Sequence, residues 1–397
     1  MADNKDKKVL NVPALRFPEF TEEWKRIRVS DLLDFYSTNS LSWEQLEYKL
    51  NEPYNLHYGL IHVGLPILVD LTKDELPSIK EGNVPKKYEL CKEGDVAFAD
   101  ASEDTNEVAK VVEFYNLDGK KVVCGLHTIH GRDNNKQTAK GFLGYCFSST
   151  VFHYQIRRIA QGTKIYSINT RNFSEAFVGL PSKSEQHKIA TLLKLIDERI
   201  STQNKIIKDW KKLKSAIYQK IFESLVAPTL KLGQIVEIIK GQQVNGTDLL
   251  EQGDYYVMNG GTTPSGWLNT YNTECNTISI SEGGNSCGYV QYNTSRYWSG
   301  GHCYSLRILN THETIDLYLY HYLKWQEGNI MALRIGSGLP NIQKKDLLRF
   351  PVILPTISLQ KRIVSILNAI EEKVTCENSI TEHFTKHKEY LLNKLFI

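Results

Sequence analysis

The 397-residue sequence lacks several features that would assign it to particular classes of protein. No G-x-x-x-x-G-K-[ST] run is present, so we expect that this chain does not hydrolyse ATP itself. Its seven cysteines form no C-x-x-C pair, and the odd number argues against a complete disulfide framework. The longest nearly uncharged apolar stretch, Tyr58 to Val69, is too short to span a bilayer, and the start "MADNKDKKVL" has no apolar region of the secretory type. These absences predict a cytoplasmic protein with no membrane partner and with cysteines that are small buried residues.

The net charge of +3 is too small to prove a polyanionic partner, but the charge is unevenly distributed. Residues Ser184 to Phe222 hold nine Lys and Arg against four acids. Such a run indicates either a solvated helix face or a surface near phosphate groups.

A long internal repeat dominates the second half of the sequence. A shift of 174 residues aligns Gly162 to Phe222 with Gly336 to Phe396 without a gap. The matches include Leu180 with Leu354, Pro181 with Pro355, Gln186 with Gln360, Leu193 with Leu367 and Phe222 with Phe396. The period exceeds that of common solenoid repeats, so the sequence indicates a two-fold duplication.

Each copy contains a heptad-like apolar pattern that predicts a long helix of about 39 residues, roughly 58 Å. Leu-Pro precedes both helices, Ser182 and Glu185 match an S-x-x-E capping box, and Thr356 or Ser358 is positioned to cap the second helix. A narrow apolar stripe needs a partner of equal length, and two copies related by a two-fold axis predict an antiparallel pair. The seam residues are Leu193, Ile196, Ile200, Ile207, Trp210, Ile217 and Ile221 in one copy and Leu367, Ile370, Val374, Phe384, Leu391 and Leu395 in the other.

Two segments of different character, Asn11 to Gly179 (the first head) and Thr229 to Ile353 (the second head), are rich in Tyr, Gly, Asn, Ser and Thr. Strand-like runs occur in both: "DVAFAD", "KVVCGLHTI", "NTISIS", "GYVQY" and "HCYSLRIL". The heads also begin alike, "VSDLLDF" paralleling "LGQIVEI" at an offset of 203 residues. Similar frames with divergent interiors predict two heads of one design.

Two local patterns resemble catalytic or metal motifs without completing them. "NEPY" (Asn51 to Tyr54) imitates the Asn-Pro-Pro-Tyr sequence of adenine methyltransferases, but it has Glu52 at the second position and no Gly-rich cofactor loop before it. We interpret it as a turn before a strand. Cys124, His127 and His130 lack a fourth ligand at usual spacing, and alternate strand residues point to opposite faces, so we predict no metal site there.

The chain resembles the specificity subunit of Type I restriction-modification systems. The resemblance is carried by "GLPSKSEQHKIATLLKLID" and "ILPTISLQKRIVSILNAIE", by the opening "RFPEFTEEWKRIRVSDLL", and by "YELCKEGDV" at 88 to 96. It implies an α+β fold in which two globular α/β target recognition domains are separated by two long antiparallel coiled-coil helices, with a pseudo-two-fold internal repeat. The implied domains are residues 1–180 and 224–354 for the recognition domains and 181–223 and 355–397 for the spacer helices.

The same resemblance implies a non-catalytic role in a larger complex. Each head would read one half of a bipartite site in double-stranded DNA, and the helices would fix the gap between the halves. The implied partners are two adenine methyltransferase subunits, which bind S-adenosylmethionine, and restriction (motor) subunits, which bind ATP; no cofactor is expected in this chain.

Base recognition needs donors and acceptors at loop tips, and phosphate contacts set the register. The loop after "GDVAFAD" (Asp100 to Asn106) corresponds to the loop after "NTISIS" (Glu282 to Ser286). The predicted DNA-binding residues of the first head are Ser102, Asn106, Arg132, Asn134, Lys136, Lys164 and Arg171. Those of the second head are Lys240, Gln242, Gln243, Asn245, Ser281, Asn285, Tyr292, Arg296, Ser337 and Lys344.

Two alternatives from other classes stay open at the level of sequence. Trp267, Trp298 and many Tyr, Asn and Gly residues in the second head would also suit a glycan-binding or adhesion protein. A self-contained DNA methyltransferase is the other alternative, and it would need the cofactor loop that the sequence lacks.

Overall fold

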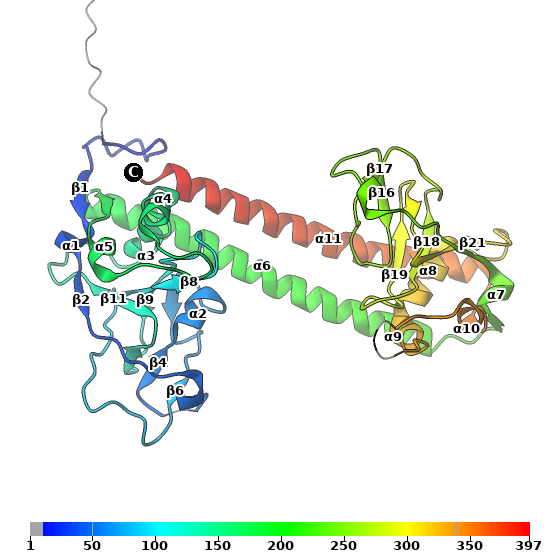
Figure 1. Ribbon diagram of the computed structural model, residues 1–397, viewed down its shortest axis with the longest axis horizontal. Helices are drawn as coiled ribbons and strands as arrows, with labels where there is room; N and C mark the ends of the chain where they lie inside the picture. Colours follow the sequence, from blue (N-terminus) through cyan, green and yellow to red (C-terminus); the bar gives the residue numbers. More distant parts are fainter. Residues whose placement is uncertain (1–10, 50, 337, 339) are drawn as a thin grey trace, which may run out of the picture. The chain divides into compact units, whose positions relative to one another are not determined.

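The computed structural model describes residues 11–49, 51–336, 338 and 340–397, and packing divides the chain into two compact units (Figure 1). The first unit holds the residues up to Asn204 together with Ile380–Ile397, and the second holds Lys205–Ser379. Each unit therefore contains one head and part of each long helix. Among the described helices, none combines the length and the apolar character that crossing a membrane requires.

The first head is built on a five-stranded sheet in the order β2-β11-β7-β9-β5, with a separate four-stranded sheet in the order β10-β4-β6-β3. Strand β7 is buried on both faces: Val96 and Phe98 join one apolar cluster, and Ala97 and Ala99 join another. The elements in chain order are β1 (Lys25–Arg28), α1 (Val29–Leu32), β2 (Asp34–Tyr36), η1 (Trp43–Gln45), β3 (Leu46–Glu47), β4 (Tyr54–Leu56), α2 (Tyr58–His62), β5 (Leu68–Asp70), β6 (Ser78–Ile79), β7 (Val96–Ala99), β8 (Ala101–Ser102), β9 (Val111–Asn116), β10 (Val122–Cys124), β11 (Thr128–Arg132), α3 (Phe142–Phe147), α4 (Thr150–Ile159), β12 (Tyr166–Ser167), α5 (Thr170–Ser174) and β13 (Phe177–Leu180).

The second head is built on a four-stranded sheet in the order β15-β21-β18-β19, with a smaller sheet in the order β17-β16-β20. Helix α8 covers β18 and β19 with Tyr318, Leu319 and Tyr322, all of which are buried. The elements are β14 (Thr229–Lys231), α7 (Leu232–Ile235), β15 (Val236–Lys240), η2 (Gly246–Asp248), β16 (Tyr255–Met258), β17 (Trp267–Leu268), β18 (Thr277–Ser281), β19 (Val290–Asn293), β20 (Trp298–Ser299), β21 (Cys303–Ile308), α8 (Asp316–Trp325), α9 (Glu327–Met331), α10 (Lys344–Leu348) and β22 (Pro351–Ile353). All five strand-like runs of the sequence thus form strands.

The two heads share one backbone frame, as the offsets of 203 and 174 residues predict. In each head the first strand pairs antiparallel with the last, and the next short helix is hydrogen-bonded to the residue that precedes the last strand. The equivalent contacts are Ile27–Val178 with Leu230–Val352, and Val29–Ala176 with Leu232–Phe350. The central order β2-β11-β7-β9 of the first head likewise matches β15-β21-β18-β19 of the second.

Two long helices, α6 (Lys183–Glu223) and α11 (Ile357–Lys394), follow the heads. Their bounds lie within three residues of the predicted spacer segments. Every residue of the predicted seam is buried or half-buried, whereas the charged residues between them are mostly exposed. In the first unit, Leu193 of α6 and Leu391 of α11 belong to the core of the first head. In the second unit, Phe222 of α6 and Leu367 of α11 belong to the core of the second head.

Within the first unit, α6 and α11 run in opposite directions. Lys388 Nζ lies 2.5 Å from Asp197 Oδ1, and the guanidinium of Arg199 lies 5.6 Å from the ring centre of Phe384. The contact two residues further toward the C-terminus of α6 is therefore made by a residue four positions nearer the N-terminus of α11.

The second unit repeats both contacts at positions shifted by 174 residues. Lys214 Nζ lies 2.5 Å from Glu371 Oε1, and Lys373 Nζ lies 6.0 Å from the ring centre of Trp210. The ion pair and the cation–π contact are therefore conserved by the internal repeat, with the helices exchanging roles. The predicted antiparallel pairing is confirmed inside each unit.

A buried glutamine joins each long helix to its head. Gln186 accepts a hydrogen bond from Ala139 N (2.7 Å) and donates to Pro181 O (2.9 Å) and Gln137 O (3.3 Å). The fixed amide side chain thus satisfies one donor and two acceptors of the backbone where the helix begins.

The repeat-related Gln360 makes the same three types of bond, accepting from Ile315 N (2.8 Å) and donating to Pro355 O (2.8 Å) and Glu313 O (2.7 Å). Both glutamines are fully buried. The match of Gln186 with Gln360 in the sequence repeat therefore corresponds to an equivalent set of side-chain hydrogen bonds in each unit.

The start of α6 differs from the expected capping box. Ser182 Oγ accepts from Glu185 N at 3.4 Å, as predicted. The carboxylate of Glu185 is engaged instead by Arg16, through Nε (2.7 Å) and Nη2 (2.8 Å), and by Trp24 Nε1 (3.2 Å). Glu185 thus fastens the N-terminal segment to the helix. At the equivalent position of α11, Leu359 packs against the second core.

The buried carboxyl group of Glu113 on β9 closes the start of helix α3. Its oxygens accept hydrogen bonds from Gly141 N and from Gly144 N, the latter at 2.8 Å. Burial raises the pKa of Glu113 to about 7, although the two amide donors and the charge of Lys140 oppose the rise. The first head therefore contains an acid that titrates near neutral pH.

We expect Gln186→Leu and Gln360→Leu each to lower the free energy of unfolding of their own unit by about 2 to 4 kcal/mol, because each leaves buried backbone groups without partners. Hydrogen exchange of the full chain should assign the loss to the first unit for Q186L and to the second for Q360L. Gln219→Leu, at an exposed position of α6, is the control and should change little. Equal protection in all four proteins would contradict the role of these glutamines.

We expect the first head to lose stability as pH rises from about 4.5 to about 7, by up to about 3 kcal/mol, because Glu113 ionises in the unfolded chain before it ionises in the folded one. Glu113→Gln should remove this slope while lowering stability at low pH, since the amide presents a donor to a backbone N–H. Denaturant unfolding at pH 5 and pH 7.5 measures the difference, with the exposed Glu81→Gln as control. An unchanged slope in E113Q would refute the assignment to Glu113.

Candidate nucleic-acid interface

The loop after β7 in the first head is held in place by backbone hydrogen bonds at its first residue. Asp100 N donates to His127 O (3.1 Å), and Asp100 O accepts from Ile168 N (2.9 Å). The side chains of Asp100 and His127 also meet, with Oδ1 3.1 Å from Nδ1. The loop therefore leaves the sheet from a fixed starting point.

The second head uses the same scheme after β18. Glu282 N donates to His302 O (2.9 Å), and Glu282 O accepts from Ile342 N (2.8 Å). Because Ile342 is the repeat partner of Ile168, the predicted correspondence between the two loops agrees with the backbone contacts. In both heads an acidic residue and a histidine face each other across the sheet end.

A short hairpin from the repeat segment lies beside each of these loops. Strand β12 pairs with β8 in the first head, with Tyr166 opposite Ser102. In the second head, Asn341 bridges to Gly283 and to Ile335, just as Ser167 bridges to Gln161 in the first. The structure thus brings the loop after the central strand and the repeat hairpin together in both heads.

In the first head, this arrangement gathers four polar side chains that we call the β8–β12 surface: Ser102, Asn106, Arg157 and Lys164. Ser102 Oγ accepts from Asp104 N (3.1 Å), and Asn106 Oδ1 accepts from Arg157 Nη1 (2.8 Å). Asn106 and Lys164 are exposed, and Ser102 is half-buried. Arg157, in the last turn of α4, was not among the predicted residues, although "RR" at 157 and 158 ends an amphipathic helix next to the hairpin.

In the second head, four polar side chains gather at the matching end of the sheet, and we call them the β15–β18 surface: Lys240, Gln242, Gln243 and Asn285. All four are exposed. Lys240 Nζ lies 2.7 Å from Glu282 Oε1. Gln242 is fixed through its backbone, since its N–H donates to Ser299 O (2.8 Å) and its carbonyl accepts from Trp298 Nε1 (3.1 Å).

Three predicted residues of the first head, Arg132, Asn134 and Lys136, lie elsewhere. Strand β11 runs antiparallel to β7, with Thr128 opposite Ala99, so residues after Arg132 leave from the opposite end of the sheet to Asp100. Five residues of strand separate the two ends by about 16 Å. Asn134 donates to Asp34 Oδ2 (2.6 Å) and to Tyr36 OH (2.7 Å), and Lys136 is exposed.

Arg132 is buried, and its donors are taken by protein groups. The guanidinium holds both oxygens of Asp95 at 2.8 Å and also bonds Glu89 Oε1 and Leu90 O. Burial alone would raise the pKa of Asp95, but hydrogen bonds from His130 and Arg132 outweigh it and lower the pKa. Four of the five N–H donors of Arg132 are thus bonded within the described part of the chain, and its role in this structure is to join β11 to the run 88–96.

In the second head, Ser281 and Tyr292 are likewise engaged inside the protein. Ser281 is buried and donates to Gly260 O (2.6 Å), and Tyr292 OH donates to Asp316 Oδ2 at the start of α8. Arg296 is half-exposed and pairs with Glu274 (2.9 Å), beyond the far end of β18.

The remaining predicted residues lie around these surfaces or outside the described part. Arg171 is exposed on α5 and Lys344 is exposed on α10, both shortly after the repeat hairpins. Asn245 Nδ2 donates to Asp248 (3.2 Å) within its own loop. Ser337 lies outside the described residues.

The two incomplete motifs also have structural outcomes. Tyr54 of "NEPY" begins β4 and is buried, consistent with a turn before a strand. His127 lies apart from Cys124 and His130, as expected, but Cys91 joins these two residues, and the ligand atoms of Cys91, Cys124 and His130 lie within 4.8 Å of one another. The sequence spacing gave no signal for Cys91, because it is 33 residues from Cys124 and meets it only through pairing next to β10.

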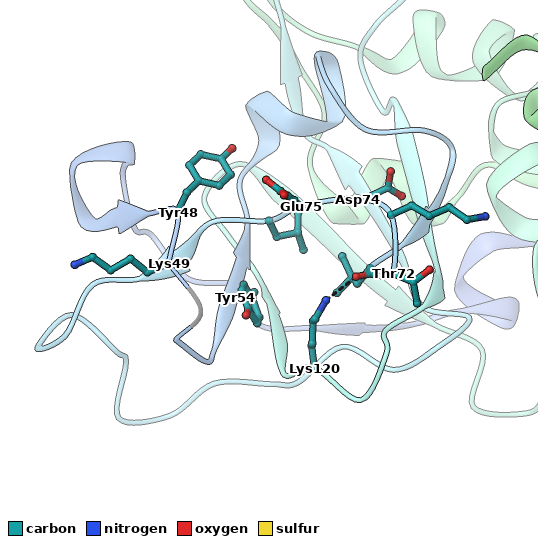
Figure 2. A pocket seen from close by; sticks show the side chains of 10 residues that line it. Tyr48, Lys49, Tyr54, Thr72, Asp74, Glu75 and Lys120 are labelled. Carbon is teal, nitrogen blue, oxygen red and sulfur yellow. Dashed lines mark hydrogen bonds between the residues drawn. The ribbon is translucent and has the colours of Figure 1, made fainter. Parts of the chain in front are cut away.

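One cavity of about 360 Å³ opens in the first head beside the four-stranded sheet (Figure 2). Figure 2 shows Lys120 reaching to the backbone carbonyl of Leu71, a bond of 2.6 Å, below the side chains of Asp74 and Glu75. Tyr48 and Lys49 lie on the other side. The lining mixes both charge signs and contains no predicted site residue, so it is separate from the β8–β12 surface.

Comparison with known proteins bears directly on the family. The family model of the type I restriction modification DNA specificity domain matches residues 114–209 and 228–385, which is well over half of the chain. These stretches include β10 to β13 of the first head, all the strands of the second head and most of both long helices.

Individual relatives agree with this match. The chain is 35% identical over 167 residues to a putative type I specificity subunit of Mycoplasma pneumoniae, covering 42% of this chain and 44% of that protein. It is 24% identical to a putative type I restriction enzyme specificity subunit of Methanocaldococcus jannaschii, covering 95% and 93% of the two chains. The crystal structure of a type I restriction-modification S subunit from Mycoplasma genitalium has the same fold, with a TM-score of 0.64, 20% identity and 97% and 99% coverage. The chain belongs to the type I restriction-modification specificity subunit family.

Proposed function

We propose that this chain is the DNA-recognition subunit of a type I restriction-modification complex and that each head reads one half of a bipartite target. The proposal is based on the shared backbone frame of the heads. Equivalent backbone hydrogen bonds at Asp100 and Glu282 fix the starts of two loops, and these loops carry different polar side chains. Two different half-sites require such an arrangement, because bases are distinguished by the pattern of donors and acceptors that meet them. Membership of the family supports the same function.

The side chains of the two surfaces divide into two chemical groups. Four exposed amides and one half-buried hydroxyl suit base edges: Asn106 and Ser102 in the first head and Gln242, Gln243 and Asn285 in the second. Lys164, Arg157 and Lys240 suit phosphates, with Arg171 and Lys344 beside them. We propose that the amides specify sequence and that the cations set the register on the duplex.

The two long helices suit a spacer. Because α6 and α11 pair in opposite directions with a fixed register in each unit, we propose that they set the gap between the half-sites. We further propose that two methyltransferase subunits, which bind S-adenosylmethionine, and restriction subunits, which bind ATP, supply all catalysis. In this scheme the partner extrudes an adenine at a cost of a few kcal/mol, and this chain selects which adenine is reached.

The alternatives have less support. A glycan-binding protein would use Trp298 as a stacking surface, but its indole N–H is engaged by Gln242 O and the ring is half-buried. A self-contained methyltransferase would need an accessible aromatic at "NEPY", and Tyr54 is buried.

We expect methylated adenines to mark a bipartite motif when the chain is expressed with its methyltransferase partner and a genome is mapped, with one modified adenine in each half and on opposite strands. Exchange of residues 229–353 for the second head of a relative should change one half and leave the other half and the gap intact. The unexchanged chain in the same host is the control. A continuous motif, or a change in both halves after one exchange, would refute modular recognition.

We expect Lys164→Ala to weaken binding of the assembled complex to target DNA about 3- to 10-fold and to make the slope of log affinity against log salt shallower by about one, because one phosphate contact is lost. Lys136→Ala, an exposed lysine from the opposite end of β11, is the matched control and should leave the slope unchanged. Fluorescence anisotropy titrations at salt concentrations from about 50 to about 200 mM measure the affinity and the salt slope of both variants. A loss in K136A with none in K164A would mean that the other end of the sheet faces DNA.

A further inference from the structure

Three buried side chains with metal-binding atoms meet in the first head. Cys91 Sγ and Cys124 Sγ lie 3.5 Å apart, and the ligand atoms of Cys91, Cys124 and His130 all lie within 4.8 Å of one another. Their exposed fractions are 5%, 2% and 0%, so all three side chains are shielded from solvent. Cys91 precedes β7, Cys124 ends β10 and His130 lies on β11, so the group joins three separate parts of the chain.

The imidazole of His130 is held in the orientation that a metal ligand needs. Its Nε2 lies 2.7 Å from Asp95 Oδ2, and Asp95 in turn receives two bonds from Arg132. A carboxylate paired with arginine stays ionised and only accepts hydrogen bonds, so Nε2 carries the hydrogen and Nδ1 keeps a free lone pair. Nδ1 is buried and has no hydrogen-bond partner within the described part of the chain. Metal-binding histidines characteristically donate their second nitrogen to a carboxylate in this way.

The separation of the two sulfurs is close to that of two zinc-bound thiolates. With Zn–S bonds of about 2.3 Å and tetrahedral angles, two zinc-bound sulfurs lie about 3.8 Å apart. The observed separation of 3.5 Å is close to this value, and the ligand atoms of all three residues lie within 4.8 Å of one another. Two thiolates balance the charge of Zn²⁺, and Arg132 balances Asp95, so the buried group would carry no net charge.

A cavity lies next to one of the three residues. Cys124 lines a cavity of about 260 Å³ together with Asn39, Ser40, Tyr88 and Glu89. Three protein ligands with water in the fourth position is an established zinc arrangement.

We propose that Cys91, Cys124 and His130 bind one zinc ion, with water from this cavity as the fourth ligand and Asp95 as the residue that orients His130. The ion would join β10 of the four-stranded sheet to β11 of the five-stranded sheet. Strand β11 in turn pairs with β7, which leads to the loop at Asp100. Among the described residues of the second head, no such group of Cys and His side chains is found, so we place the site in the first head. This assignment reverses the absence of metal expected from sequence spacing, and it does not depend on DNA recognition.

The test is metal content of the full-length chain, purified with a reductant after growth with zinc and washed with a weak chelator. We expect about one zinc per chain, falling at least about fivefold in Cys91→Ala and in Cys124→Ala, since each variant removes one of only three protein ligands. Cys146→Ala is the matched control, because Cys146 is another buried cysteine of the first head outside the group and should retain the zinc.

Cobalt gives a second measurement that does not depend on the folding of variants. Co²⁺ added to the metal-free wild-type chain should produce the near-ultraviolet absorption of cobalt–thiolate bonds, with saturation near one equivalent. Wild-type protein with intact thiols that gives no such band, or C124A that keeps the zinc of the wild type, would overturn the proposal. A disulfide between Cys91 and Cys124 in the reduced preparation, detected by mass spectrometry after alkylation, would also overturn it.

Discussion

The opposed pairing of α6 with α11 is the constraint on which both units depend. Each unit uses the same ion pair and the same cation–π contact at positions related by the 174-residue repeat, Asp197 with Lys388 in one and Lys214 with Glu371 in the other. Neither helix could bury its narrow apolar stripe alone, and each head builds part of its core on the seam residues that face it. The duplication therefore supplies each helix with a partner whose pattern already matches.

A shared backbone frame allows the loops of the heads to differ. The bonds that fix the loop starts run between main-chain atoms, as between Asp100 O and Ile168 N or between Glu282 O and Ile342 N, and so they place no demand on neighbouring side chains. Sequence patterns predicted this level of the structure well. The heptad seam, the five strand-like runs, the 203-residue offset and the correspondence of the two loops all follow from periodicity and from the spacing of apolar residues, which are local properties.

Contacts between distant residues were not predictable in the same way. Arg132 carries the chemistry expected of a guanine-binding residue, but Asp95, 37 residues earlier, holds it inside the protein. Glu185 matches a helix cap, but Arg16, 169 residues earlier, takes its carboxylate. Cys91 meets Cys124 and His130 only because its segment pairs next to β10. In each case tertiary pairing, which one sequence does not reveal, decides the role of a side chain whose type suggested another.

The sheets of the two heads bury different polar groups, and this difference bears on how far the heads are interchangeable. Where β11 lies against the start of β7, away from the β8–β12 surface, the first head buries a charged network of Asp95, His130 and Arg132. At the matching place in the second head, hydroxyl groups form a chain, with Tyr297 OH 3.0 Å from Ser305 Oγ and Ser305 Oγ 3.1 Å from Ser299 Oγ. A buried charge without its partner costs far more than a buried hydroxyl without one, so β11 of the first head could not be replaced alone by β21 of the second. The unit that can be exchanged without loss is the whole head, bounded by the strand pairs β1–β13 and β14–β22, because those pairs have the same register in both.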